Sequence, residues 1–207
     1  MNKLRKWALE CPDSPAVAIW STGSSWSELE AAAEAIVPEN SLTVLERNNA
    51  IVFVVRFCAA VAGERQCVVL DPTWPRDVIA EIIHRLSSIG PAEAIDLVDG
   101  DPESRFLISL TSGTTSFQKA VSRSRGSWQH SFGASQGFFG PLSEDITLAP
   151  GSLAAGLNLF ALAECLYSGS VFRALDSFDV GKAHENPADM KTFDREGIPT
   201  QRLRNPP

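Results

Sequence analysis

The sequence predicts an α/β fold in which β-α units surround a largely parallel sheet. Short apolar runs alternate with amphipathic stretches along most of the chain, which is typical of such units. The chain has 207 residues, enough to bury a core in one or two domains. Hydrophobic residues make up 44% of it and are spread throughout, which excludes a disordered or low-complexity protein.

Apolar runs of strand length define the predicted strands, which cover residues 16–20, 42–46, 66–70, 105–110 and 170–175. Helices are predicted over residues 31–36, 76–86, 128–136 and 154–167, and over the stretch that ends before Gly63. The helix starts carry candidate capping residues, namely Ser27 with Glu30 as a capping box, Asn48 or Asn49, and Ser127. The last 24 residues, 184–207, hold four prolines and many charges without an apolar period, so we expect an extended or disordered tail there.

Charge and hydropathy exclude several classes of protein. The net charge is −7 with a pI near 5.0, and no basic stripe is present, which argues against a nucleic-acid-binding protein. The most apolar run, residues 51–63, is interrupted by Arg56 and is shorter than a membrane helix requires. The N-terminus lacks an apolar core of signal-peptide length. We therefore expect a cytoplasmic protein with no membrane span.

Cysteine and histidine provide no predicted metal site. The four cysteines form no C-x-x-C pair, which excludes a zinc ribbon and argues against a disulfide scaffold. His84, His130 and His184 stand beside no Cys, Asp or Glu at ligand spacing. We expect His84 on a helix surface. His130 follows the segment described next and could face it, but an ordinary helix position is the preferred interpretation.

Small polar residues fill the segment directly after the strand at 105–110. Six consecutive Gly, Ser or Thr residues occupy positions 111–116, and Lys119 follows. Such a loop can turn backbone N–H groups and hydroxyls toward an anion, and the lysine can add a positive charge to a di- or triphosphate. The segment is not a P-loop, because Ala120 stands where Ser or Thr is required. An ordinary polar turn between two strands is the alternative.

Residues 110–121, LTSGTTSFQKAV, resemble the phosphate-binding signature T-S-G-T-T-G-x-P-K-G of the adenylate-forming superfamily, which includes acyl-CoA synthetases and peptide synthetase adenylation domains. The matching positions are Thr111, Ser112, Gly113, Thr114, Thr115 and Lys119. Ser116, Gln118 and Ala120 depart from the signature. Further segments resemble the family in the same order, at residues 11–18, 24–36, 59–83 and 148–172. The resemblance extends over about residues 7–183.

The resemblance implies an AMP-dependent ligase, which joins a carboxylic acid to ATP as an acyl-adenylate and passes the acyl group to coenzyme A or an acyl-carrier protein. It implies ATP and Mg²⁺ as cofactors, with Thr111, Ser112, Gly113, Thr114, Thr115, Ser116 and Lys119 in the nucleotide site. The apolar stretch 154–166, charged only at Glu164, favours a fatty or aromatic acid, as in fatty acid metabolism. No residue is assigned as catalytic, and none as a metal ligand.

The ribose motif and the C-terminal catalytic lysine of the family have no counterpart in this sequence. We therefore expect a truncated chain, with an incomplete AMP-binding domain at residues 1–183 and a divergent tail at 184–207, inactive by itself. One alternative is an inactive remnant or an ATP-binding module that needs a completing partner chain or self-associates. Another is an unrelated flavodoxin-like nucleotide-binding domain, disfavoured by the ordered matches.

Several other residues receive structural interpretations. Asp71 is expected in a turn at a strand end instead of acting as a catalytic acid. Arg123 and Arg125 are expected on a solvated strand edge. The aromatic residues Trp74, Trp128 and Phe132 are expected to pack.

Overall fold

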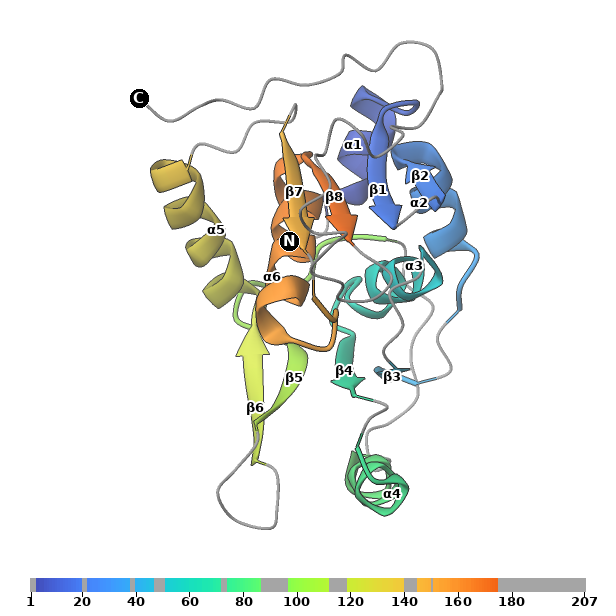
Figure 1. The fold of residues 1–207 in the computed structure, drawn as a ribbon, viewed down its shortest axis with the longest axis vertical. Helices are drawn as coiled ribbons and strands as arrows, with labels where there is room; N and C mark the ends of the chain where they lie inside the picture. The colour runs from blue at the N-terminus through green and yellow to red at the C-terminus, as the bar shows by residue number, and fades with distance from the viewer. Residues whose placement is uncertain are drawn as a thin grey trace.

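Two four-stranded sheets organise the part of the chain that the computed structural model describes, namely residues 3–19, 22–37, 40–46, 51–71, 74–86, 97–111, 119–139, 145–149 and 151–174 (Figure 1). The strands are β1 (Pro15–Ile19), β2 (Thr22–Ser25), β3 (Leu42–Glu46), β4 (Gln66–Leu70), β5 (Arg105–Thr111), β6 (Lys119–Ser124), β7 (Ile146–Ala149) and β8 (Val171–Ala174). The helices are α1 (Leu4–Glu10), α2 (Trp26–Glu34), α3 (Ile51–Ala60), α4 (Arg76–Leu86), α5 (Arg125–Phe139) and α6 (Gly156–Ser168).

Parallel pairing dominates both sheets. The first sheet has the strand order β2-β1-β8-β7 and the second β3-β4-β5-β6. The pairs β1–β8, β7–β8, β3–β4 and β4–β5 are parallel, whereas β1–β2 and β5–β6 are antiparallel. The predicted α/β class with largely parallel strands is confirmed. The strands divide between two sheets because β8 pairs with β1 and β7 and not with an edge strand of the second sheet.

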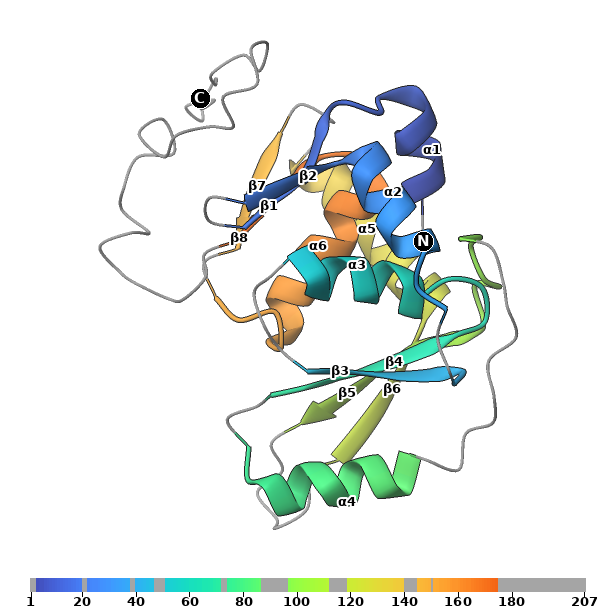
Figure 2. The ribbon, with the colours of Figure 1, turned by 90° about the vertical axis from the view of Figure 1, so that its right-hand side faces the viewer.

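The main core lies between the two sheets, where α3 and α6 are sandwiched (Figure 2). It includes Phe53 and Phe57 of α3, Leu159 and Leu162 of α6, and Phe172 of β8, each at most 3% exposed. Helix α3 is apolar almost all round its axis, as a helix must be when both sides are buried. This double-sided burial holds the second sheet, and everything attached to it, against the first.

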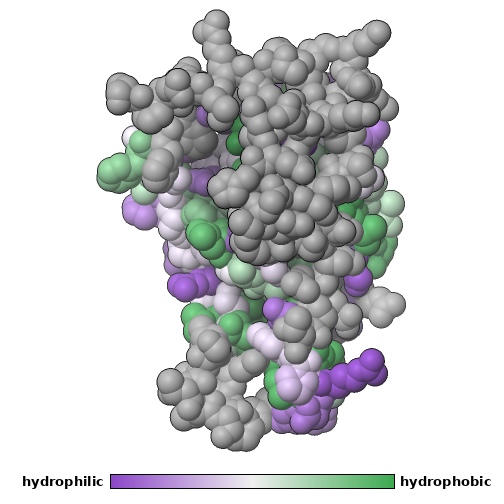
Figure 3. All heavy atoms as spheres, viewed as in Figure 1, coloured by the Kyte–Doolittle hydropathy of each residue, from purple (hydrophilic) through white to green (hydrophobic). Residues whose placement is uncertain are grey.

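Helix α4 covers the other face of the second sheet. Its Ile79 and Ile82 pack on Val68, Leu70 and the remaining members of a small apolar cluster. Its outward side is hydrophilic, as Figure 3 shows, and His84 is exposed there as predicted. The bounds of α4, like those of β3 and β4, coincide with the predicted ranges, because a clear apolar period and flanking turn residues mark all three.

The capping box of α2 is formed by Ser25 and Glu28, so the predicted pair Ser27 and Glu30 is wrong by two residues. The Glu28 N–H donates to Ser25 Oγ at 3.3 Å, and the Ser25 N–H donates to Glu28 Oε2 at 2.9 Å. Ser27 instead donates its hydroxyl to the Pro12 carbonyl at 2.9 Å. The helix starts earlier because β2 ends at Ser25 and leaves that residue extended at the first helical turn.

The start of α5 also differs from the prediction. The Ser127 N–H donates to Ser124 Oγ at 3.3 Å, so Ser124 and not Ser127 caps this helix. Short elements without a clear period, α1, β2, β6 and β7, were not predicted individually. The predicted caps Asn48 and Asn49 and the tail 184–207 lie outside the described residues.

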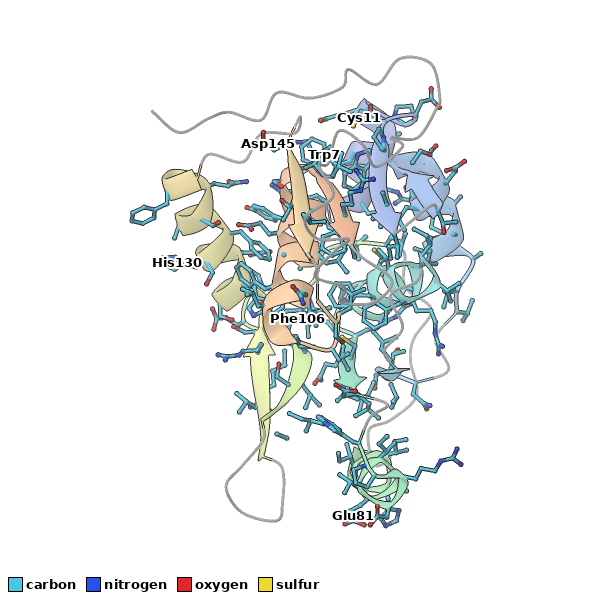
Figure 4. The ribbon with its side chains drawn as sticks, in the orientation of Figure 1. Trp7, Cys11, Glu81, Phe106, His130 and Asp145 are labelled. Carbon is cyan, nitrogen blue, oxygen red and sulfur yellow. The ribbon has the colours of Figure 1, made fainter. Side chains whose placement is uncertain are left out.

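The described helices include none that is long and apolar enough to cross a membrane. The four cysteines are free thiols. Cys58, Cys67 and Cys165 are buried, whereas Cys11 is half-buried near the start of the chain (Figure 4). Burial raises the pKa of Cys58 and of Cys67 to about 12, and it raises the pKa of Cys165 as well.

Thiol titration with Ellman's reagent should therefore count one fast equivalent in the native protein at pH 8, from Cys11. Raising the pH to 10 should still leave Cys58 and Cys67 unreacted, because a thiol with a pKa near 12 is only about 1% thiolate there. Denaturation should raise the count to four. Two or more fast equivalents at pH 8 would contradict the burial of these side chains.

Candidate functional site

The Ser/Thr/Gly segment joins the two strands of the β5–β6 hairpin. Thr111 is the last residue of β5 and Lys119 the first of β6, and the two are register partners across the antiparallel pair. The predicted site residues Ser112, Gly113, Thr114, Thr115 and Ser116 lie outside the described residues. The structure thus brings the backbone of Thr111 and Lys119 together at the tip of the hairpin. A phosphate-binding loop and an ordinary turn both fit this position.

This hairpin tip lies at the carboxyl edge of three parallel strands. Glu46 of β3 is level with Leu70 of β4, and Val68 of β4 is level with Ile108 of β5. Strands β3, β4 and β5 therefore end at the same edge, from which the 112–118 connection leaves. In α/β sheets, ligands bind outside the carboxyl ends of parallel strands. The observed register thus places the candidate segment where such a site is expected.

Asp71 stands directly after β4 at the same edge. The Trp74 N–H donates to the Asp71 carbonyl oxygen at 3.0 Å, which closes a turn. The interpretation of Asp71 as a turn residue at a strand end is confirmed. Trp74 packs partly buried against the cluster under α4, also as expected.

Arg125 fixes the opposite end of the hairpin, and its predicted place on a solvated strand edge is wrong. The side chain is fully buried at the first residue of α5, directly after β6. Its guanidinium donates to Ser104 Oγ at 2.7 Å and to the carbonyl oxygens of Arg105, Val61 and Arg65 at 2.9, 3.1 and 2.7 Å. Arg123, two residues earlier, is exposed as predicted.

These contacts join three parts of the fold. Arg105 begins β5 and Ser104 directly precedes it, whereas Val61 and Arg65 belong to the connection between α3 and β4. Space around the guanidinium is tight, because a Cβ added at Gly100 would lie 2.7 Å from Arg125 Nε and would overlap the Gly63 carbonyl. The root of the hairpin is thereby tied to the adjacent strand. No sequence signal predicts this role, since an arginine in the first turn of a helix is ordinarily solvated.

Glu64 adds an acidic group beside this root. The Asp101 N–H donates to Glu64 Oε1 at 2.8 Å. This backbone hydrogen bond holds the pKa of the exposed Glu64 carboxylate below its ordinary value, with smaller contributions from Ser104 and the Arg125 charge. Burial lowers the pKa of the Arg125 guanidinium, and the nearby Glu64 charge opposes that effect.

Aromatic side chains join α5 to α6 behind the hairpin. The Trp128 ring lies 5.1 Å from those of Phe106 in β5 and Phe160 in α6. Phe132 contacts Phe160 and Tyr167, with ring centroids 5.0 and 5.3 Å apart. The predicted packing roles of Trp128 and Phe132 are confirmed. His130 is exposed on the side of α5 that faces away from α6 (Figure 4).

The described residues contain no group of three His, Cys, Asp or Glu side chains that could hold a metal ion. The nucleotide-contacting donors expected from the sequence are hydroxyl and amide groups and one lysine. These groups suit the oxygen atoms of a phosphate chain and do not form a metal cage.

Comparisons with known proteins find similar proteins that include CoA ligases and a CoA synthetase. No family model matches the chain. The chain is 35% identical over 100 residues to YhfT, an uncharacterised acyl-CoA ligase of Bacillus subtilis (strain 168). The aligned residues make up 48% of this chain and 21% of the relative. The chain thus spans about a fifth of that curated relative.

Solved structures share the fold over most of the chain. O-succinylbenzoate coenzyme A synthetase (MenE) of Bacillus subtilis, solved with ATP and magnesium, superimposes with a TM-score of 0.74 at 17% identity, over 88% of this chain and 46% of that one. A putative long-chain-fatty-acid CoA ligase of Rhodopseudomonas palustris superimposes with a TM-score of 0.69 at 13% identity, over 87% of this chain and 58% of that one. VinN superimposes with a TM-score of 0.66 at 17% identity, over 83% of this chain and 55% of that one.

Proposed function

We propose that this chain carries the nucleotide-phosphate-binding part of an acyl-adenylate-forming ligase. The premise is that likeness in fold and in sequence together indicates the adenylate-forming superfamily and the fold of its N-terminal domain. The observation that carries the proposal is the position of the Ser/Thr/Gly segment. It closes the β5–β6 hairpin at the carboxyl edge of three parallel strands, with Lys119 paired opposite Thr111.

In this function the segment binds the phosphates of ATP. The hydroxyls of Thr111, Ser112, Thr114, Thr115 and Ser116 donate hydrogen bonds to phosphate oxygens, and Gly113 permits close approach of the backbone. The Lys119 ammonium steadies the charge of the departing pyrophosphate when a carboxylate attacks the α-phosphate. Mg²⁺ bound to the triphosphate would supply charge neutralisation on the phosphate oxygens.

The proposed acid is a fatty or aromatic carboxylate, and the acceptor coenzyme A or an acyl-carrier protein. The apolar sequence of residues 154–166, charged only at Glu164, supports this choice of acid. The solved relatives include MenE bound to an acyl-adenylate intermediate. We place residues 1–183 in this adenylation domain and 184–207 outside it, and the free thiols favour a cytoplasmic protein.

A second candidate function is ATP binding without turnover, with a partner chain that supplies the remaining groups. The chain spans about half the length of the solved structures that it matches.

ATP–pyrophosphate exchange distinguishes the two candidates. The purified chain is incubated with ATP, Mg²⁺, labelled pyrophosphate and either octanoate or benzoate, beside its Lys119→Ala variant. A ligase should return label to ATP only when a carboxylate is present, and the variant should lower the rate at least about tenfold, since a charged hydrogen bond to phosphate is lost. Saturable ATP binding without exchange would support the binding module. A chain that neither binds ATP nor exchanges pyrophosphate would contradict both.

A further inference from the structure

A cavity of about 390 Å³ lies at the edge of the second sheet, away from the hairpin. Strand β3 forms one edge of this sheet and β6 the other, with β4 and β5 between them. The cavity is bounded by the connection between α2 and β3, by the first part of β3 and by one side of α3. Its described lining residues are Ile36, Val37, Asn40, Leu42, Thr43, Val44, Arg56, Ala59 and Ala60. It is therefore distinct from the proposed nucleotide site.

Small side chains on α3 create the space. Ala59 and Ala60 follow Arg56 by three and four residues, so all three lie on the same side of the helix. The two alanines are buried, whereas Arg56 is exposed. The α3 side of the cavity thus combines two small buried side chains with one exposed cationic side chain. A volume of this size is sufficient for a small organic molecule.

Thr43 is one of three polar residues in the lining, together with Asn40 and Arg56. The Thr43 Oγ1 atom is buried and has no hydrogen-bond partner among the residues that the structure describes. Native structures rarely leave a buried hydroxyl unpaired, because its hydration is lost without compensation. Rotation about χ1 exchanges the hydroxyl and methyl groups on Cβ, so the hydroxyl can be presented to a molecule in the cavity.

Arg56 completes the polar pattern. It makes no ion pair with any residue in the part of the chain that the structure describes. A single guanidinium beside aliphatic walls matches a monoanion with an apolar body, since phosphate sites gather several donors. A carboxylate also fits the planar fork of arginine.

We propose that this cavity binds a small aromatic or aliphatic carboxylate, with the carboxylate on the Arg56 guanidinium and a polar substituent hydrogen-bonded to the Thr43 hydroxyl. The apolar body of the ligand lies against Ala59, Ala60 and Ile36. This site is separate from the proposed acyl-adenylate chemistry and does not depend on it.

The test uses 4-hydroxybenzoate as the probe, because it carries a carboxylate and a hydroxyl at opposite ends of an apolar ring. Titration of the full chain is followed by amide chemical shifts in NMR, without nucleotide. We expect saturable shifts around Thr43, Ala59 and Ala60. Arg56→Gln should weaken binding at least tenfold, whereas Arg76→Gln, a matched exposed arginine on α4, should leave the dissociation constant unchanged.

Thr43→Val provides a second measurement that does not depend on the ligand alone. The variant has nearly the same shape and removes the unpaired hydroxyl, so the unliganded protein should melt at a higher temperature while probe affinity falls severalfold. The proposal is overturned if shifts cluster elsewhere, if Arg56→Gln binds as tightly as wild type, or if inorganic phosphate competes with the probe at equal concentration.

Discussion

Replacement of Arg125 by methionine is expected to lower the free energy of unfolding by about 3 kcal/mol, or roughly 10 °C in melting temperature. The fully buried guanidinium makes four hydrogen bonds, three of them to backbone carbonyl oxygens. Methionine fills part of the same volume but offers no donor. The carbonyls of Val61 and Arg65 would lose this partner in a site too tight to admit much water.

Arg123→Met is the matched control, because it makes the same chemical change two residues away on an exposed strand position. Urea unfolding of both variants and wild type gives the comparison directly. The control should change stability by less than about 0.5 kcal/mol. If Arg125→Met were as stable as Arg123→Met, the hydrogen bonds of Arg125 would not hold the root of the hairpin.

Local pattern accounts for much of the fold. Strands β3 and β4 and helix α4 have the predicted bounds, because each shows a clear apolar period between turn residues. The pairing of strands could not be predicted from local pattern, since nothing in the sequence of β8 indicates that it lies beside β1. The predicted capping box of α2 lies two residues after the observed one, because no local pattern indicates that β2 ends at Ser25.

In the candidate site, too, some features follow from local sequence and others depend on segments that are distant in the chain. Residue types predicted the chemistry of the segment at 111–119, whereas its position at the carboxyl edge follows from strand register. The burial of Arg125 could not be predicted, because it depends on carbonyl groups from two distant segments, the start of β5 and the connection between α3 and β4. The cavity beside Thr43 is likewise assembled from the connection after α2, from β3 and from α3, so no contiguous sequence motif predicts it.

Lys119→Ala is expected to weaken binding of ATP–Mg²⁺ by at least about tenfold, since it removes a charged hydrogen bond to phosphate. Lys119 begins β6 opposite the end of β5, at the tip of the hairpin. Arg123 pairs with Leu107 nearer the root of the same hairpin, so Arg123→Ala controls for a general loss of positive charge. Circular dichroism of both variants should match wild type.

Calorimetric titration of the purified chain tests this central claim most directly. ATP–Mg²⁺ and a non-hydrolysable acyl-adenylate analogue are titrated into wild type, Lys119→Ala and Arg123→Ala. We predict saturable binding of both ligands by wild type and Arg123→Ala, and at least tenfold weaker binding by Lys119→Ala. Absence of binding to folded wild-type protein, or equal affinity in all three proteins, would contradict a nucleotide-phosphate site on this hairpin.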